Sequence, residues 1–224
     1  MDYNGIVYKI LEKLKMKYDP NKKKEYEKHL INEIIEYTKY LICEEVKPID
    51  LLYIAIDGPA PRAKMIQQRS RRYKSIQQEK LMAKIKKKHD VENTPQFIGS
   101  INMAPGTEFM MNLIKKLKKA CKDNVFSGHL EKGKSLEIIF NGGDIPGEAE
   151  HKFMPLVRRM RKIKKHRDDV ICIYSGDGDL IELGLINNKN NIYIIQEFDM
   201  KRLGRIVDGY ENKEFIYMDI DAIK

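Results

Sequence analysis

Three strand-loop-helix units are the feature that most constrains how this chain folds. In each unit a short apolar run stops at a glycine-containing loop, and a segment with helical spacing follows; the runs are residues 51–56, 136–140 and 170–174. Short apolar runs with these boundaries are typical of buried strands. Strands that alternate with helices predict an α/β fold with a mostly parallel central sheet flanked by helices. Residues 192–198 are expected to add a further strand.

Apolar spacing and helix-starting residues predict the helices. Residues 25–43 carry apolar side chains at helical spacing. Pro61 suits the first turn of a long helix that runs to about His89. Thr107 is expected to cap the N-terminus of another helix. The second and third units contribute helices from about residue 148 to 164 and from residue 179 through 185.

Carboxylates follow each of the three strand runs. The carboxyl ends of the strands are where open α/β sheets bind ligands, so we expect these acids to converge on one crevice. Clustered carboxylates repel one another, and hard oxygen ligands favour Mg²⁺ or Mn²⁺ as the cation that offsets the repulsion. Taken singly, an Asp before Gly is usually a turn residue and a Glu at a helix start is favoured by the helix dipole. The candidate ligands are Asp2, Asp57, Glu148, Glu150, Asp177 and Asp179.

One segment supplies nearly all of the net charge. Residues 62–88 hold eleven Lys and Arg against one acid, a net charge of +10, whereas the whole chain carries +9. A concentrated basic stripe favours a polyanionic partner, most often nucleic acid, and the ordinary alternative is a solvated helix face. Four polar side chains at i, i+4, i+7 and i+8 share one face of the expected helix and suit the oxygens of a terminal 5′-phosphate. They are Lys64, Gln68, Arg71 and Arg72.

Length, hydropathy and cysteine usage limit the class of protein. A chain of 224 residues suggests one domain, and no apolar run is long enough to cross a membrane. Cys43, Cys121 and Cys172 are odd in number and widely spaced, which excludes a disulfide scaffold and a CxxC zinc site. With no secretory signal at Met1, we expect an intracellular protein, cytoplasmic rather than nuclear.

Several sequence blocks, in the same order, resemble Xrn-type 5′→3′ exoribonucleases. The most specific is residues 57–73, which closely resemble the family's DGxAPRAKMxQQRSRR block. The further blocks are residues 2–6 (DYNGI), 105–110 (PGTEFM), 146–152 (PGEAEHK) and 173–185 (IYSGDGDLIELGL), with residues 197–198 resembling the end of the next strand.

The resemblance implies a PIN-like nuclease core that removes 5′-nucleotides from 5′-monophosphorylated single-stranded RNA, as in RNA degradation. It assigns metal ligation to the six acids named above, and a 5′-phosphate pocket to the four polar residues of the basic helix. Tyr8 occupies the position of an aromatic residue on which the family stacks a base, and tyrosine can also stack. The implied chemistry is phosphodiester hydrolysis with two Mg²⁺ or Mn²⁺ ions. The resemblance implies no membrane partner, and it does not indicate protein partners.

Residues 1–224 are expected to form one Xrn-like N-terminal nuclease domain that is incomplete at both ends. The family has a strand and a leading segment before the block that residues 2–6 resemble, and a later GNDF-type block that adds a carboxylate. Neither is found in the printed sequence.

Two other functions fit parts of the pattern. A flap-endonuclease-like DNA nuclease also combines clustered acids with a basic helix, but the block at residues 57–73 favours the exoribonuclease. A catalytically impaired RNA-binding fragment would account for the missing blocks. The six retained acids oppose it, because a protein that only binds polyanions gains nothing from an acidic cluster.

Overall fold

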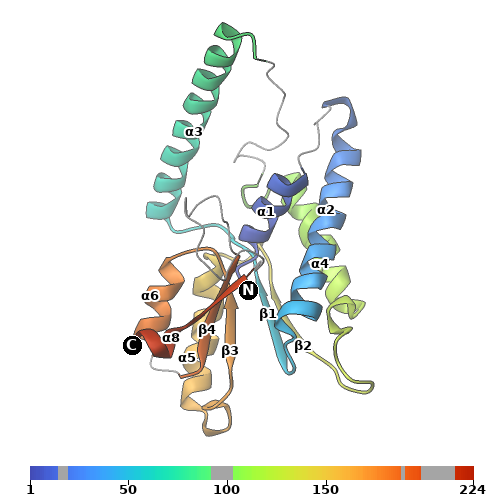
Figure 1. Cartoon of the computed structure of the whole chain (residues 1–224), viewed down its shortest axis with the longest axis vertical. Helices are drawn as coiled ribbons and strands as arrows, with labels where there is room; N and C mark the ends of the chain where they lie inside the picture. Colours follow the sequence, from blue (N-terminus) through green and yellow to red (C-terminus); the bar gives the residue numbers. More distant parts are fainter. Residues whose placement is uncertain (15–19, 92–102, 188–189, 198–214) are drawn as a thin grey trace, which may run out of the picture.

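Two hydrogen-bonded sets of strands form the centre of the fold (Figure 1). The computed structural model describes residues 1–14, 20–91, 103–187, 190–197 and 215–224. β1 pairs with β2 in parallel, β3 pairs with β4 in parallel, and β4 pairs with β5 antiparallel. The strands are β1 (Leu51–Ala55), β2 (Glu137–Asn141), β3 (Ile171–Tyr174), β4 (Ile192–Glu197) and β5 (Phe215–Asp219).

The first three residues join the two sets of strands. Asp2 forms a parallel bridge with Ala55: the Ala55 N–H donates to the Met1 carbonyl at 3.1 Å, and the Tyr3 N–H donates to the Ala55 carbonyl at 2.9 Å. On its other side, the Asp2 N–H donates to the Tyr174 carbonyl at 2.9 Å. Residues 1–3 therefore lie as a short extended segment between β1 and β3, and the spatial order is β2, β1, residues 1–3, β3, β4, β5.

Helices cover both faces of this assembly, because side chains alternate along the strands between two cores (Figure 1). Leu52 and Ile54 of β1 pack in the core formed with α1, α2 and α4. Ala55 packs in the second core, with α5, α6 and α8. The α-helices are α1 (Asn4–Leu14), α2 (Lys23–Tyr40), α3 (Arg62–Lys88), α4 (Glu108–Lys122), α5 (Ala149–Lys162), α6 (Asp179–Ile186) and α8 (Ile220–Ile223). Shorter turns are η1 (Pro20–Lys22), the π-helical η2 (Leu41–Val46), η3 (Val125–Ser127) and η4 (Lys164–His166).

The expected α/β elements are confirmed in order and kind. The three apolar runs form β1, β2 and β3, and residues 192–197 form β4. The helix expected at residues 25–43 is α2 with its π-helical continuation, and Pro61 stands immediately before α3. Thr107 caps α4, since its hydroxyl accepts a hydrogen bond from the Met110 N–H at 3.5 Å.

Two parts of the structure differ from expectation. α1, which begins at Asn4 directly after the strand bridge at Asp2, was not expected from the sequence. The antiparallel β5 and the short α8 after it were not anticipated, because a single apolar run near the end of a chain gives no sign of its pairing partner. Phe198, expected to end β4, lies outside the described residues.

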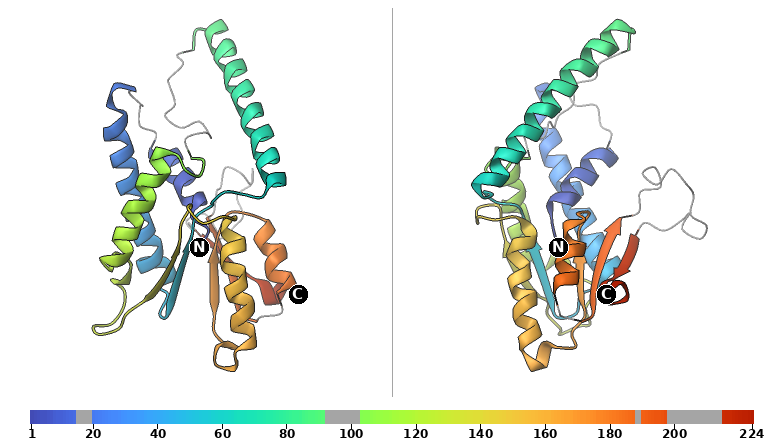
Figure 2. Two further views of the ribbon diagram at one scale, coloured as in Figure 1. Left: turned by 180° about the vertical axis from the view of Figure 1, so that it is seen from behind. Right: turned by 90° about the vertical axis from the view of Figure 1, so that its left-hand side faces the viewer.

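α3 extends away from the sheet in every view (Figures 1 and 2), and none of its residues is fully buried. Its high content of Lys, Arg and Gln leaves no continuous apolar stripe to pack against a core. Lys64, Gln68 and Arg72 are nevertheless partly covered, whereas Arg71 is exposed. No helix among the described residues is long and apolar enough to cross a membrane.

Glu197, at the end of β4, connects the two halves of the fold. Its carboxylate pairs with the Lys9 ammonium of α1 at 2.6 Å and accepts hydrogen bonds from the hydroxyls of Tyr37 (2.6 Å) and Tyr174 (2.5 Å). Tyr174 is also the residue whose carbonyl accepts from the Asp2 N–H. This network therefore holds α1 and α2 against the strand that lies beside Asp2.

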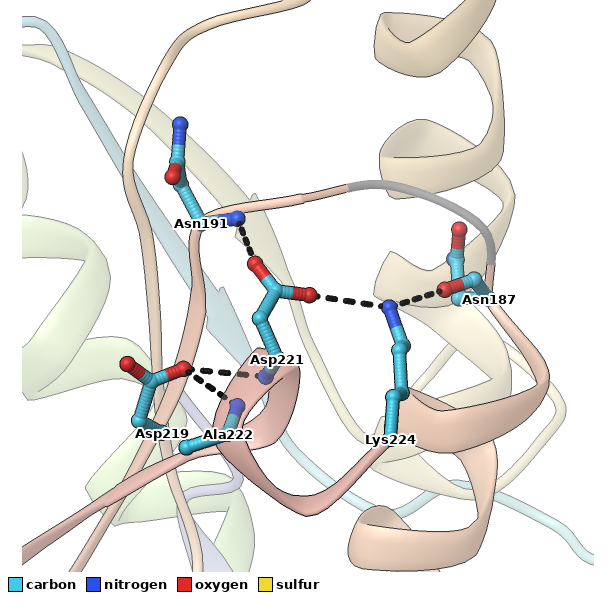
Figure 3. A network of polar contacts seen from close by, with 6 residues as sticks. All are labelled: Asn187, Asn191, Asp219, Asp221, Ala222 and Lys224. Atoms are coloured by element: carbon cyan, nitrogen blue, oxygen red, sulfur yellow. Dashed lines mark hydrogen bonds and ion pairs between the residues drawn. The ribbon is translucent and has the colours of Figure 1, made fainter.

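The C-terminal residues are fixed by a separate polar network (Figure 3). Asp219 caps α8 by accepting from the Asp221 N–H at 2.9 Å and the Ala222 N–H at 3.3 Å. Asp221 accepts from the Asn191 N–H at 2.6 Å and pairs with the Lys224 ammonium at 3.0 Å. These bonds attach α8 to the start of β4, far along the chain from α8 itself.

Candidate functional site

Asp2 and Asp57 come together where residues 1–3 and β1 end. Asp57 lies two residues after the last residue of β1, and Asp2 is bridged to that last residue, Ala55. Burial raises the pKa of the Asp2 carboxyl, and the nearby Asp57 charge raises it further. These two predicted acids, 55 residues apart in the chain, are therefore electrostatically coupled neighbours.

Asp57 is also attached to the start of α5. Its Oδ1 accepts from the Ala149 N–H at 2.8 Å, and its Oδ2 accepts from the Asn4 side-chain amide at 2.8 Å. Burial raises the pKa of the Asp57 carboxyl, and the Glu148 charge adds to this effect. Two donors thus fix the orientation of a carboxylate whose charge is poorly solvated.

Glu148 and Glu150 stand at the first turn of α5, beside His151. One ligand atom from each of these three residues lies within 4.8 Å of the other two. Burial raises the pKa of Glu150, and the charges of Glu148 and Asp57 raise it further. His151 is exposed and was not among the ligands expected from the sequence.

Ser175 connects the third pair of acids to Asp2. Its hydroxyl donates to Asp2 Oδ2 at 3.0 Å and accepts from the Asp177 N–H at 3.1 Å. Asp179, the first residue of α6, donates its N–H to Asp177 Oδ1 at 3.3 Å. Asp177 and Asp179 are both exposed. Asp177 is therefore linked through Ser175 to the partly buried acids, and Asp179 is linked to Asp177 by its backbone N–H.

Lys64, in the first turn of α3, touches the acids directly. Its ammonium lies 2.6 Å from Glu148 Oε2. This hydrogen bond raises the pKa of Lys64, and the charges of Glu148, Glu150 and Asp177 act in the same direction. The start of the basic helix is therefore at the rim of the acidic cluster. For Arg71 and Arg72, the described part of the chain shows no ion pair with an acid.

Tyr8 is half exposed on α1, one turn beyond Asn4. Residues at i and i+4 share a helix face, and the Asn4 side chain on that face donates to Asp57. Tyr8 is therefore on the same face of α1 as Asn4, and half of its side chain is exposed.

The residues of this cluster fit a hard divalent cation. Its candidate ligands are carboxylate oxygens from four separate segments, the donor type that Mg²⁺ and Mn²⁺ prefer. Burial raises the pKa values of Asp2, Asp57 and Glu150, and the charges of neighbouring acids add to this effect, so a bound cation would stabilise their ionised forms.

Three supporting residues were missed from the sequence. Asn4 and Ser175 orient Asp57 and Asp2, and Lys152 donates to two carbonyls at the strand ends. Lys152 offered a usable signal, because it lies four residues after Glu148 and hence on the same helix face. Asn4 and Ser175 offered none beyond lying two residues from an acid, Asp2 and Asp177 respectively.

Glu150→Gln is expected to stabilise the chain in a chelating buffer at neutral pH. When the pKa of a carboxyl is higher in the folded state than in the unfolded state, its protonated form stabilises the fold. This stabilisation is fully present below the unfolded pKa and is lost as the pH rises through the folded pKa. The ionised Glu150 therefore destabilises the fold near pH 7, and an uncharged amide avoids this cost. We expect the melting temperature to rise by roughly 1–3 °C at pH 7 and to change little at pH 4. A melting temperature of Glu150→Gln below that of the wild type at pH 7 would contradict the claim that the ionised Glu150 destabilises the fold.

Comparisons with known proteins point to one family. A family model described as "XRN 5'-3' exonuclease N-terminus" matches residues 1–198. The chain is 36% identical over 173 residues to 5'-3' exoribonuclease 1 of Saccharomyces cerevisiae, covering 76% of this chain and 11% of the relative. It is 33% identical over 204 residues to 5'-3' exoribonuclease 1 of Schizosaccharomyces pombe (88% and 14%), and 36% identical over 210 residues to 5'-3' exoribonuclease 2 of Gallus gallus (88% and 21%). The chain thus spans between a tenth and about a fifth of the length of these relatives.

Proposed function

Because this chain belongs to the XRN 5'-3' exonuclease family by its match to the N-terminal region, we propose that it hydrolyses single-stranded RNA from a 5′-monophosphate end and releases 5′-nucleotides. The observation that carries the proposal is the 2.6 Å contact between Lys64 and Glu148, which joins the basic helix to the acids. The match over residues 1–198 favours this function over that of a flap endonuclease. We further propose that residues 1–224 form one nuclease domain with a PIN-like core.

In this proposal the six acids hold Mg²⁺ or Mn²⁺. The chemistry that such ions would supply at this site is activation of a water molecule and stabilisation of the leaving oxygen of the phosphodiester. The chain's own contribution is orientation: Asn4 and the Ala149 N–H hold Asp57, and Ser175 holds Asp2. Such supporting hydrogen bonds tune a metal site because they fix the angle at which each ligand is presented. The ligands are Asp2, Asp57, Glu148, Glu150, Asp177 and Asp179.

The first turns of α3 would grip the 5′-phosphate. Lys64 provides a point charge, Gln68 an amide donor, and Arg71 and Arg72 forked donors that match phosphate oxygens. Holding the terminal phosphate places the first phosphodiester next to the acids, which makes hydrolysis effectively intramolecular. Tyr8 would stack on the first base. A pocket fitted to a monophosphate would exclude a triphosphate or a cap by size.

The proposal is tested with two RNAs of one sequence that carry either a 5′-monophosphate or a 5′-hydroxyl. With Mg²⁺ we expect the 224-residue chain to release mononucleotides from the 5′ end of the phosphorylated RNA, and to act much more slowly on the other. Equal rates would remove the phosphate pocket. Tight binding of phosphorylated RNA without loss of nucleotides would instead favour an RNA-binding role, and better cleavage of flap DNA would favour a flap endonuclease.

A further inference from the structure

Lys152 lies on α5 two residues after Glu150, and its ammonium donates hydrogen bonds to main-chain carbonyls. Its Nζ donates to the Ile56 carbonyl at 2.6 Å and to the Gly142 carbonyl at 2.9 Å. These residues directly follow the last residues of β1 and β2. In the part of the chain that the structure describes, no carboxylate lies within ion-pair distance of Lys152. One side chain of α5 therefore ties together the ends of two neighbouring strands.

The Ile56 carbonyl depends on this contact. Ile56 is fully buried, and a buried carbonyl that lacks a hydrogen-bond donor destabilises the fold. The carbonyl belongs to the peptide that joins Ile56 to Asp57, so its orientation is coupled to the direction in which the Asp57 side chain leaves the backbone. The Lys152 ammonium therefore holds the carbonyl of the residue that immediately precedes the candidate ligand Asp57.

The rest of Lys152 holds α5 against the same strand. Its own carbonyl accepts from the Tyr53 hydroxyl at 2.9 Å, and its side chain passes close to Gly147, where a Cβ would lie 3.9 Å from the Lys152 Cγ. Gly147 has a φ of +110°, a conformation that glycine adopts without strain. Together with the bond from the Ala149 N–H to Asp57, these contacts fix the first turns of α5 relative to β1.

The charge of Lys152 also bears on the cluster. Burial lowers the pKa of its ammonium, and the charges of Asp57 and Asp144 oppose that effect. A partly buried ammonium that donates to carbonyls, rather than to a carboxylate, leaves the oxygens of the acids available to a cation. In this it differs from Lys64, which occupies an oxygen of Glu148.

We propose that Lys152 is a positioning residue of the cation site: by fixing the Ile56–Asp57 peptide against α5, it sets the separation of Asp57 from Glu150. This role rests on the proposed function, because it requires that these acids bind a divalent cation. It adds a residue that neither contacts the cation nor binds the 5′-phosphate.

The test compares Lys152→Met with Arg159→Met, which changes an exposed cation on the same helix. Two quantities are measured on the full chain: the dissociation constant of Mn²⁺ by electron paramagnetic resonance, and the ratio of affinities for 5′-phosphorylated and 5′-hydroxyl RNA in EDTA. We expect Lys152→Met to raise the Mn²⁺ dissociation constant about tenfold or more and to leave the RNA ratio unchanged, because loss of an outer-shell partner costs about 10–100-fold in metal affinity. Arg159→Met should change neither.

An unchanged Mn²⁺ dissociation constant in folded Lys152→Met would overturn the role, and so would a parallel loss of the RNA ratio, which indicates general disruption. If Lys152→Met does not fold, Lys152→Arg is measured instead, because it keeps a cationic donor in altered geometry. Weaker Mn²⁺ binding by Lys152→Arg at a retained melting temperature would support the positioning role, and unchanged Mn²⁺ binding would refute it. Wild-type protein that binds no Mn²⁺ would refute the cation site of the proposed function itself.

Discussion

Replacement of Asp57 by asparagine is expected to reduce Mg²⁺-dependent release of 5′-nucleotides about a thousandfold. Asp57 is the acid with the most connections in the cluster, since it receives two hydrogen bonds and interacts electrostatically with Asp2, Glu148 and Glu150. Asparagine keeps the shape and one acceptor but removes the charge that a cation requires. Metal ions contribute several kcal/mol to stabilising such a transition state, which corresponds to roughly 10³-fold in rate.

Asp123→Asn is the matched control for this change. Asp123 follows α4, is exposed, and its carboxylate makes no ion pair within the part of the chain that the structure describes. We expect its substitution to leave the rate within about twofold, because an exposed acid without an ion pair contributes little. Undiminished turnover in Asp57→Asn, at a melting temperature similar to that of the wild type, would remove Asp57 from the metal site.

Lys64→Met is expected to abolish most of the preference for a 5′-monophosphate over a 5′-hydroxyl. A charge-assisted hydrogen bond contributes about 1.5–3 kcal/mol, which corresponds to a roughly 10–150-fold loss of preference. Removal of Lys64 also frees Glu148 from its 2.6 Å ion pair, so Mn²⁺ affinity should be retained or increased. The measurement is the ratio of kcat/KM for the two RNAs, together with the Mn²⁺ dissociation constant.

Lys84→Met provides the control, because it removes an exposed lysine from the same helix between five and six turns further along. It should weaken RNA binding slightly and equally for both 5′ ends, since contacts to the phosphate backbone do not depend on the terminal group. A preference that survives in Lys64→Met, or that is lost equally in Lys84→Met, would place the phosphate pocket elsewhere.

The order of elements and the position of the acids along the chain could be predicted because both depend on short-range sequence patterns. Each apolar run ends at a loop with glycine, and parallel strands bring their carboxyl ends to one edge, so strand order alone predicts that Asp57, Glu148 and Asp177 lie at the same edge of the sheet. The shared face of Lys64 and Gln68 likewise follows from helical spacing alone.

What could not be predicted depends on contacts between distant segments. The insertion of residues 1–3 between β1 and β3 is decided by pairing with Ala55 and Tyr174, and no local pattern in three residues encodes that pairing. The same holds for the bonds that Glu197 accepts from Tyr37 and Tyr174. The composition of α3 predicts a helix without an apolar packing face, but it does not predict how the helix extends from the sheet.

The most direct test of the cation site is diffraction from crystals of this chain grown with Mn²⁺, with data collected at a wavelength where manganese scatters anomalously. We predict an anomalous peak within coordination distance of carboxylate oxygens from at least two of the segments that carry Asp2, Asp57, Glu150 and Asp177. A map with no peak among these carboxylates at saturating Mn²⁺, or with peaks only on unrelated surface acids, would contradict the account.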